Sequence, residues 1–156
     1  MRKALISFSL LALSLSSMAA SSVVITVTGE LYAPTTCDLS QPPTVDFGDV
    51  LTSGIDNGEY EQPIDIRLDC QNRNPLQSVS VQINASSGNT NLIPVTGAAG
   101  FELALKRSGA AQNLNTPIRM DQDGPLNLTL TPVKKTGEAY VLGSFQATAT
   151  VVVSVQ

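Results

Sequence analysis

Most of the chain after residue 20 consists of short runs in which apolar or β-branched residues alternate with polar ones. Glycine, proline, asparagine and aspartate separate these runs, and no stretch has a sustained helical period. Alternation of this kind predicts β-strands, which we expect near residues 23–32, 44–47, 63–70, 78–84, 101–106, 126–132 and 144–156. Their spacing indicates an all-β domain built as a sandwich.

The last predicted strand has one apolar face and one mostly polar face. The apolar face consists of Phe145, Ala147, Ala149, Val151, Val153 and Val155. Because the run continues to the final residue, we expect the outer edge of this strand and the core beside it to remain uncovered. An uncovered edge of this kind is open to pairing with another chain.

The first predicted strand has a complementary pattern. Its apolar face consists of Val23, Ile25, Val27, Gly29, Leu31 and Ala33. Glycine within such a face often marks a close approach of another backbone, so Gly29 would let the strand pass a shallow point of a groove. The alternative is that this strand folds back as an ordinary edge strand of its own domain.

The first twenty residues have the order of a secretory signal peptide. Arg2 and Lys3 precede an apolar run over residues 4–15, which is shorter than the roughly 20 residues that a membrane span needs. Small residues favour cleavage after Ala19, and a cut after Ala20 is the alternative. We therefore expect a signal peptide over residues 1–19 and export from the cytoplasm.

The exported part suits one domain. Loss of Arg2 and Lys3 leaves seven basic and thirteen acidic residues, a net charge of about −6, which makes nucleic acid and anionic lipid poor partners. Both cysteines, Cys37 and Cys70, lie in this part, and an oxidising compartment favours a disulfide between them.

The residue inventory argues against an enzyme. The chain has no histidine, the commonest general base and metal ligand, so we expect no catalytic residue, no metal and no cofactor. The acid pairs Asp46/Asp49, Glu59/Glu61 and Asp65/Asp69 are favoured as surface or turn residues over glycosidase carboxylates. Residues 121–124 resemble part of a calcium loop but lack its later glutamate.

Several of these stretches, taken in order, resemble the pilin subunits of the chaperone–usher pathway. They are the alternating residues 23–33 with Gly29, residues 33–37 ending in Cys37, residues 45–50, residues 64–70 ending in Cys70, and residues 143–150 beginning at Gly143. One difference is Val155, since the family usually has a tyrosine at this place. The resemblance covers almost the whole exported chain.

The resemblance implies an immunoglobulin-like β-sandwich that lacks its final strand and is completed by donor-strand complementation. It implies a donor-strand extension over residues 20–34, with Val23, Ile25, Val27, Gly29 and Leu31 facing the groove, and a pilin domain over residues 35–156. The acceptor strand would comprise Gly143, Phe145, Ala147, Ala149, Val151, Val153 and Val155.

The function implied is that of a structural subunit of a fimbrium that supports cell adhesion. Its partners would be neighbouring pilus subunits, a periplasmic chaperone and an outer-membrane usher, and its destination the cell surface. A minor adaptor, a carbohydrate-binding adhesive subunit and a self-complemented secreted binding module remain alternatives. The small number of aromatic residues weighs against sugar binding, for which the chain has no tryptophan platform.

Overall fold

The computed structural model describes residues 22–40 and 44–156. The chain divides into two units, one ending at Leu31 and the other comprising Tyr32–Gln156. The expected signal peptide over residues 1–19 and its cleavage position lie outside the described residues, as do the first two residues of the expected extension.

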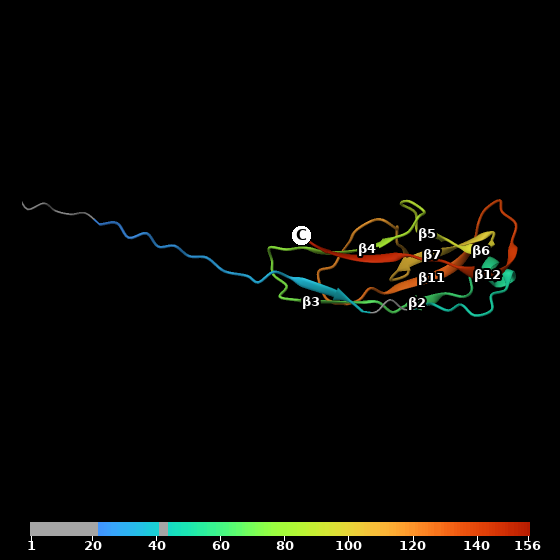
Figure 1. Ribbon diagram of the computed structural model, residues 1–156, viewed down its shortest axis with the longest axis horizontal. Helices are drawn as coiled ribbons and strands as arrows, with labels where there is room; N and C mark the ends of the chain where they lie inside the picture. Colours follow the sequence, from blue (N-terminus) through green and yellow to red (C-terminus); the bar gives the residue numbers. More distant parts are fainter. Residues whose placement is uncertain (1–21, 41–43) are drawn as a thin grey trace, which may run out of the picture. The chain divides into compact units, whose positions relative to one another are not determined.

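Residues 22–31 of the first unit form no helix or strand (Figure 1). Val23, Ile25, Val27 and Leu31 are each more than four-fifths exposed. The strand expected at residues 23–32 is therefore not formed within this chain, since no ladder includes residues of this described stretch. A β-strand needs a neighbour to satisfy its backbone groups, so alternation alone does not produce one.

The second unit is an all-β structure with one short helix, α1 (Thr52–Asp56). Among the described residues, no helix is long and apolar enough to cross a membrane. The strands are β1 (Thr36–Leu39), β2 (Gln62–Ile64), β3 (Arg67–Gln71), β4 (Val79–Asn84), β5 (Leu92–Pro94), β6 (Thr96–Ala99), β7 (Phe101–Arg107), β8 (Ala110–Ala111), β9 (Ile118–Arg119), β10 (Gly124–Pro125), β11 (Leu128–Lys134), β12 (Val141–Gln146) and β13 (Thr150–Val155).

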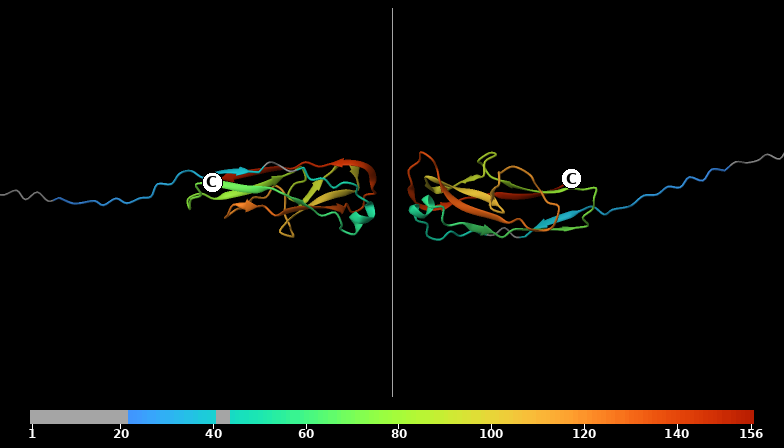
Figure 2. Two further views of the ribbon diagram at one scale, coloured as in Figure 1. Left: turned by 90° about the horizontal axis from the view of Figure 1, so that it is seen from below. Right: turned by 180° about the vertical axis from the view of Figure 1, so that it is seen from behind.

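All the strand pairings described are antiparallel. The ladders have the orders β1-β3-β10, β2-β11-β7-β5 with β8 on β7, β12-β6, and β13-β4-β9. Figure 2 shows the last strands, in red, running along the length of this unit.

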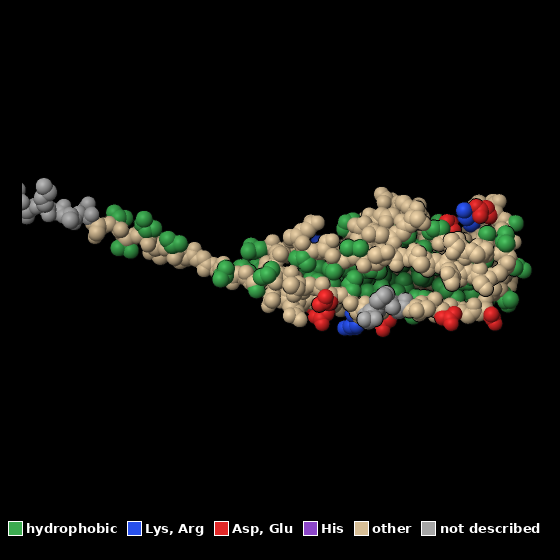
Figure 3. Space-filling view, viewed as in Figure 1, with side chains coloured by type: hydrophobic (Ala, Val, Ile, Leu, Met, Phe, Trp, Pro, Cys, Tyr) green, Lys and Arg blue, Asp and Glu red, His purple; other side chains and the backbone are tan. Residues whose placement is uncertain are grey.

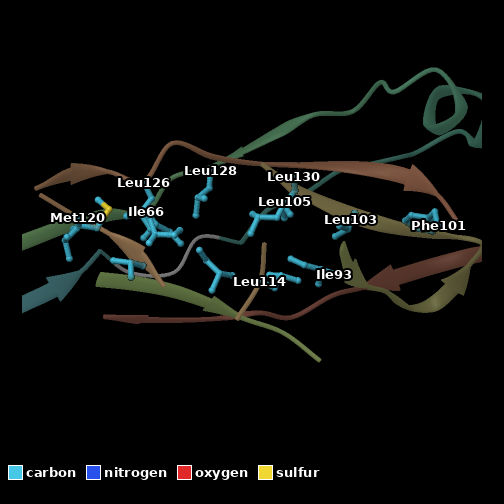
Figure 4. Packing of buried hydrophobic residues seen from close by; sticks show 14 of the residues in the cluster. Ile66, Ile93, Phe101, Leu103, Leu105, Leu114, Met120, Leu126, Leu128 and Leu130 are labelled. Atoms are coloured by element: carbon cyan, nitrogen blue, oxygen red, sulfur yellow. The ribbon is translucent and has the colours of Figure 1, made fainter. Parts of the chain in front are cut away.

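The core lies between the layers that contain β4 and the β7–β11 pair. On β4, Val79, Val81 and Ile83 alternate with polar residues and are buried. Figure 4 shows Leu105 of β7 and Leu128 of β11 among the core side chains, and both are fully buried. A two-residue alternation of this kind places one side of each strand in the core.

Besides residues 23–32, three predicted strands are absent or divided in the structure. Residues 44–47 form no strand, residues 63–70 divide into β2 and β3 at Asp65 and Ile66, and residues 144–156 divide into β12 and β13 at residues 147–149. Ser53 and Gly54, which follow one of the predicted strands, lie in α1. The predicted patterns specified which side of a segment faces the core, but the breaks depend on which neighbour each half pairs with.

The loop between β4 and β5 is held at its base by Asn115. The Nδ2 atom of Asn115 donates to the carbonyl oxygens of Ala85 and Gly88 at 3.2 and 2.6 Å, and the Ala85 N–H donates to Asn115 Oδ1 at 3.3 Å. Residues 88–90 at the tip of this loop are exposed.

Candidate functional site

A groove of about 610 Å³ runs beside the last strands. One rim is formed by residues 44–47 and the other by residues 145–149 and Val151. Its floor consists of core residues, namely Ile64, Ile66, Ile83, Ile93, Leu103, Leu105, Leu128 and Leu130. Figure 3 shows hydrophobic side chains along this recess between paler rims. The hydrophobic core is therefore open to a ligand of elongated shape.

The apolar face of β13 is less covered than the face of the strand beside it. Val151 and Val153 lie opposite Ile83 and Val81 of β4 in the antiparallel ladder. The two β4 residues are 3% and 0% exposed, whereas Val151 and Val153 are only partly buried. The sandwich therefore covers β4 and leaves its neighbour β13 partly uncovered.

Both rims of the groove have backbone groups available for pairing. In the described part of the chain, the ladder of β13 involves β4 alone, and residues 44–47 belong to no ladder. An unpaired strand edge presents N–H and C=O groups that a further strand can bind. An extended peptide fits this geometry better than a compact small molecule, because it can satisfy both the backbone groups and the apolar floor.

Two phenylalanine rings narrow the groove at one point. The ring centroids of Phe47, on one rim, and Phe145, on the other, are 6.0 Å apart. Phe145 also packs edge-to-face on Phe101, with centroids 5.0 Å apart. Phe47 and Phe145 line both this groove and a second cavity of about 510 Å³ beside α1, so the ring pair lies between the two spaces.

The second cavity has a mixed lining that includes Ile55, Phe101, Tyr140 and Gly143. The hydroxyl group of Tyr140 donates to Asp56 Oδ1 at 2.8 Å, and the Lys134 ammonium lies 4.6 Å from the centre of the Tyr140 ring. Desolvation, together with the bond to Asp56, raises the pKa of Tyr140 to about 12. Tyr140 is therefore held neutral and in a fixed position at this end of the unit.

Gly143 lies where the β12–β6 ladder changes register, between Val141 and Phe145. Its φ of +151° favours glycine. A register shift, whether a β-bulge or another irregularity of the ladder, bends a strand and redirects its side chains. Here it separates the inward Phe145 from the exposed Val141 and Leu142.

The predicted acceptor residues have different positions around the groove. Phe145, Ala147, Ala149 and Val151 line the groove, and Gly143 lines the second cavity. Val153 and Val155 pack against the core but do not line either space. The predicted donor residues 23–31 lie in the other unit, where their side chains are exposed.

The opposite rim was missed as a functional element. Residues 44–47 line the groove although their alternation predicted only an ordinary strand. Phe47 is the informative residue, since it is one of only four phenylalanines in the chain and it contacts Phe145 across the groove.

The disulfide predicted between Cys37 and Cys70 is confirmed. The two residues lie opposite each other in the β1–β3 ladder. The Cys70 N–H donates to Asp123 at 3.2 Å, and Arg73 forms an ion pair with the same carboxylate at 2.7 Å. The Arg73 hydrogen bond lowers the pKa of Asp123. The disulfide is thus part of a structural cluster.

Three of the acidic residues considered for chemistry have structural partners. Asp121 forms an ion pair with Arg119. Glu61 accepts hydrogen bonds from Lys106 and Thr131. Asp46 accepts a hydrogen bond from the Gly48 N–H. In residues 22–40 and 44–156, no cluster of acidic or cysteine side chains has a metal-binding arrangement. In the segment 121–124, which resembles part of a calcium loop, Asp123 pairs with Arg73 and Gly124 belongs to β10.

Known proteins match both the sequence and the fold. The Fimbrial protein family matches residues 25–156. Two Escherichia coli K12 proteins, the uncharacterized fimbrial-like proteins YfcR and YfcQ, are 28% and 30% identical to the chain. The YfcR match covers 92% of this chain and 87% of that protein, and the YfcQ match covers 85% and 86%.

Three solved structures have a similar fold. The P pilus rod subunit PapA has a TM-score of 0.61 and 22% identity, covering 77% of this chain and 99% of PapA. A chaperone–usher pilus structure has a TM-score of 0.61 and 19% identity, covering 91% and 100%. The P pilus adaptor subunit PapF has a TM-score of 0.52 and 17% identity, covering 81% and 98%. At these identities the likeness concerns the fold.

Proposed function

Since the chain belongs to the Fimbrial protein family and is a non-enzymatic pilus protein, we propose that it is a structural subunit that polymerises by donor-strand exchange. Its second unit is an immunoglobulin-like sandwich without the final strand, and the extension of a neighbouring copy or related subunit supplies that strand. The groove between residues 44–47 and the last strands is the observation that carries this proposal.

The exposed extension has apolar side chains that could cover the apolar floor of the groove. Val23, Ile25, Val27 and Leu31 are spaced two residues apart and are highly exposed. In an extended strand they share one face, which suits the apolar floor of the groove. Burying an aliphatic side chain of this size contributes about 1.5 to 3 kcal/mol, and backbone bonds to the two rims add to this.

The narrow point at Phe47 and Phe145 suggests the register of the donated strand. Gly29 is the donor-face residue without a side chain, so we place it at the ring pair. Val27, Ile25 and Val23 then occupy the groove toward Val151, and Leu31 enters the second cavity. This order makes the donated strand antiparallel to β12 and β13.

The same proposal assigns the remaining segments and partners. Residues 1–19 are a signal peptide, residues 20–34 the donor-strand extension and residues 35–156 the pilin domain. A periplasmic chaperone covers the groove until the subunit reaches an outer-membrane usher, after which the polymer lies on the cell surface. An open groove of this size supports the need for such a protecting partner, since exposed apolar surface promotes aggregation.

The test uses the full exported chain, purified with a cognate chaperone and then released to polymerise. Val27→Asp places a charge on the donor face, and Thr28→Asp is the matched control on the opposite face. We expect polymers from the unchanged chain and from Thr28→Asp, and chaperone-bound subunits without onward polymerisation from Val27→Asp. A stable monomer that folds without chaperone, and that is destabilised by Val27→Asp, would show that the extension completes its own domain.

A further inference from the structure

Among the described residues of the Tyr32–Gln156 unit, large aliphatic side chains that are more than half exposed occur at two places. Leu51, Val141 and Leu142, which are 66%, 56% and 81% exposed, lie on or next to the segments that line the second cavity. Leu76, 74% exposed, lies in the loop between β3 and β4. Figure 1 shows β12 at one end of this unit and the β3–β4 connection at the other.

The loop that contains Leu76 also holds the base of the extension. The Asn74 Nδ2 atom donates to the Ala33 carbonyl oxygen at 2.9 Å, and the Thr35 N–H donates to Gln77 Oε1 at 2.8 Å. Thr35, which is buried, also donates through its hydroxyl group to the Asn72 carbonyl oxygen at 3.0 Å. The chain is therefore fixed to this loop from Ala33 onward.

Chain length brings this loop close to the next subunit. In the proposed register, Leu31 of the donating copy enters the second cavity of the accepting copy. Ala33 is only two residues further along, so it lies within about 7 Å of Leu31. The β3–β4 loop of the donor is then held at the end of the acceptor where Val141 and Leu142 are exposed.

From these observations, and resting on the proposed function, we propose that a second copy of this chain covers the exposed aliphatic end. Leu76 of the donating copy packs on Leu142, Val141 and Leu51 of the accepting copy. Leu142 lies within the register shift around Gly143 and is exposed, so it is available for this contact. Each junction of a homopolymer then has two parts, the inserted strand and an end-to-end apolar contact.

Charge exchange tests the contact in polymers of the full exported chain. We expect Leu142→Asp and Leu76→Lys, each alone, to leave polymerisation possible but to make subunits dissociate about tenfold faster in denaturant. The double variant carries both changes in every copy, so each junction pairs a lysine with an aspartate, and we expect it to recover part of the loss. Thr90→Asp, at an exposed loop position, is the control.

Cysteine cross-linking gives an independent readout. A chain with Leu76→Cys and Leu142→Cys should form covalent multimers after mild oxidation, whereas Leu76→Cys with Asn89→Cys should not. Normal polymers without cross-links and without rescue by charge exchange would overturn the end contact and leave strand donation intact. Failure of the unchanged chain to polymerise at all would overturn the proposed function, and the end contact with it.

Discussion

At the scale of single residues, the Phe47–Phe145 contact narrows the groove. The ring pair joins the two rims at 6.0 Å, and Phe101 supports it from the core at 5.0 Å. Aromatic pairs at this separation are attractive beyond the area they bury, so the narrow point is a stable feature of the groove. In the proposed register, Gly29 lies at this point because it has no side chain to displace the rings.

Gly29→Val should therefore impair strand donation. The added side chain meets the ring pair, and overpacking of this kind costs typically about 1 to 3 kcal/mol, which slows polymerisation roughly five- to 150-fold. The measurement is the rate of polymer formation from chaperone-bound subunits. Thr28→Val, on the other face, is the control, and equal rates for the two variants would contradict the proposed register.

The stability of the folded unit should depend on pH through the ionisation of Tyr140. Its pKa is raised to about 12, above the ordinary value of 10.0, so the folded state favours the protonated phenol. The corresponding stabilisation is present below pH 10 and is lost as the pH rises toward 12. Tyrosinate absorbance should show one late-titrating tyrosine that disappears in Tyr140→Phe, and the loss of stability over this pH range should be smaller in that variant.

At the scale of elements, the sequence predicted which faces are buried better than it predicted where strands stop. The alternation at residues 78–84 and 101–106 predicted β4 and β7 within one residue, because both are central strands with strong apolar faces. The break at residues 147–149 was missed because β12 pairs with β6 whereas β13 pairs with β4. Nothing in the local pattern specifies that change of partner.

The candidate site was predicted on one side only. The apolar face of the last strand was visible from its period of two, and the structure places Phe145 to Val151 along the groove. The rim at residues 44–47 was taken for an ordinary strand, because the sequence does not show that its outer edge has no neighbour. The groove is a property of two distant segments, which a local pattern cannot specify.

Removal of the Cys37–Cys70 disulfide should lower the stability of the strands that it joins. The disulfide joins β1 to β3 and closes a loop with a sequence separation of 33 residues. On the chain-entropy model, Cys37→Ser combined with Cys70→Ser should lower the free energy of unfolding by about 3 to 4 kcal/mol. Urea unfolding of the subunit in complex with a donor peptide measures this change. An unchanged midpoint would show that the Arg73–Asp123 cluster alone maintains the structure.

At the scale of the whole molecule, the chain contains both an open groove and an exposed extension, and they belong to separate units. In the proposed strand exchange, a subunit would gain stability from its neighbour, since a partner that binds only the folded state shifts the folding equilibrium. We therefore expect its stability to depend on assembly as well as on its own core.

A peptide of residues 22–33 supplied in trans should stabilise a chain from which residues 20–31 have been deleted. Full occupancy of the groove at one hundred times the dissociation constant corresponds to about 2.7 kcal/mol, and the melting temperature should rise with peptide concentration. A peptide with Val27→Asp is the control. Equal stabilisation by both peptides would contradict specific occupation of the groove.

The tip of the loop between β4 and β5 is suited to the insertion of a foreign peptide. Asn115 holds the base of the loop through three hydrogen bonds, and its exposed tip at residues 88–90 does not line the groove. In the proposed polymer, a foreign epitope inserted there would leave the joint between subunits intact and would recur once per copy along the filament. Such an array would engage bivalent antibodies with an avidity far above the affinity of one isolated epitope.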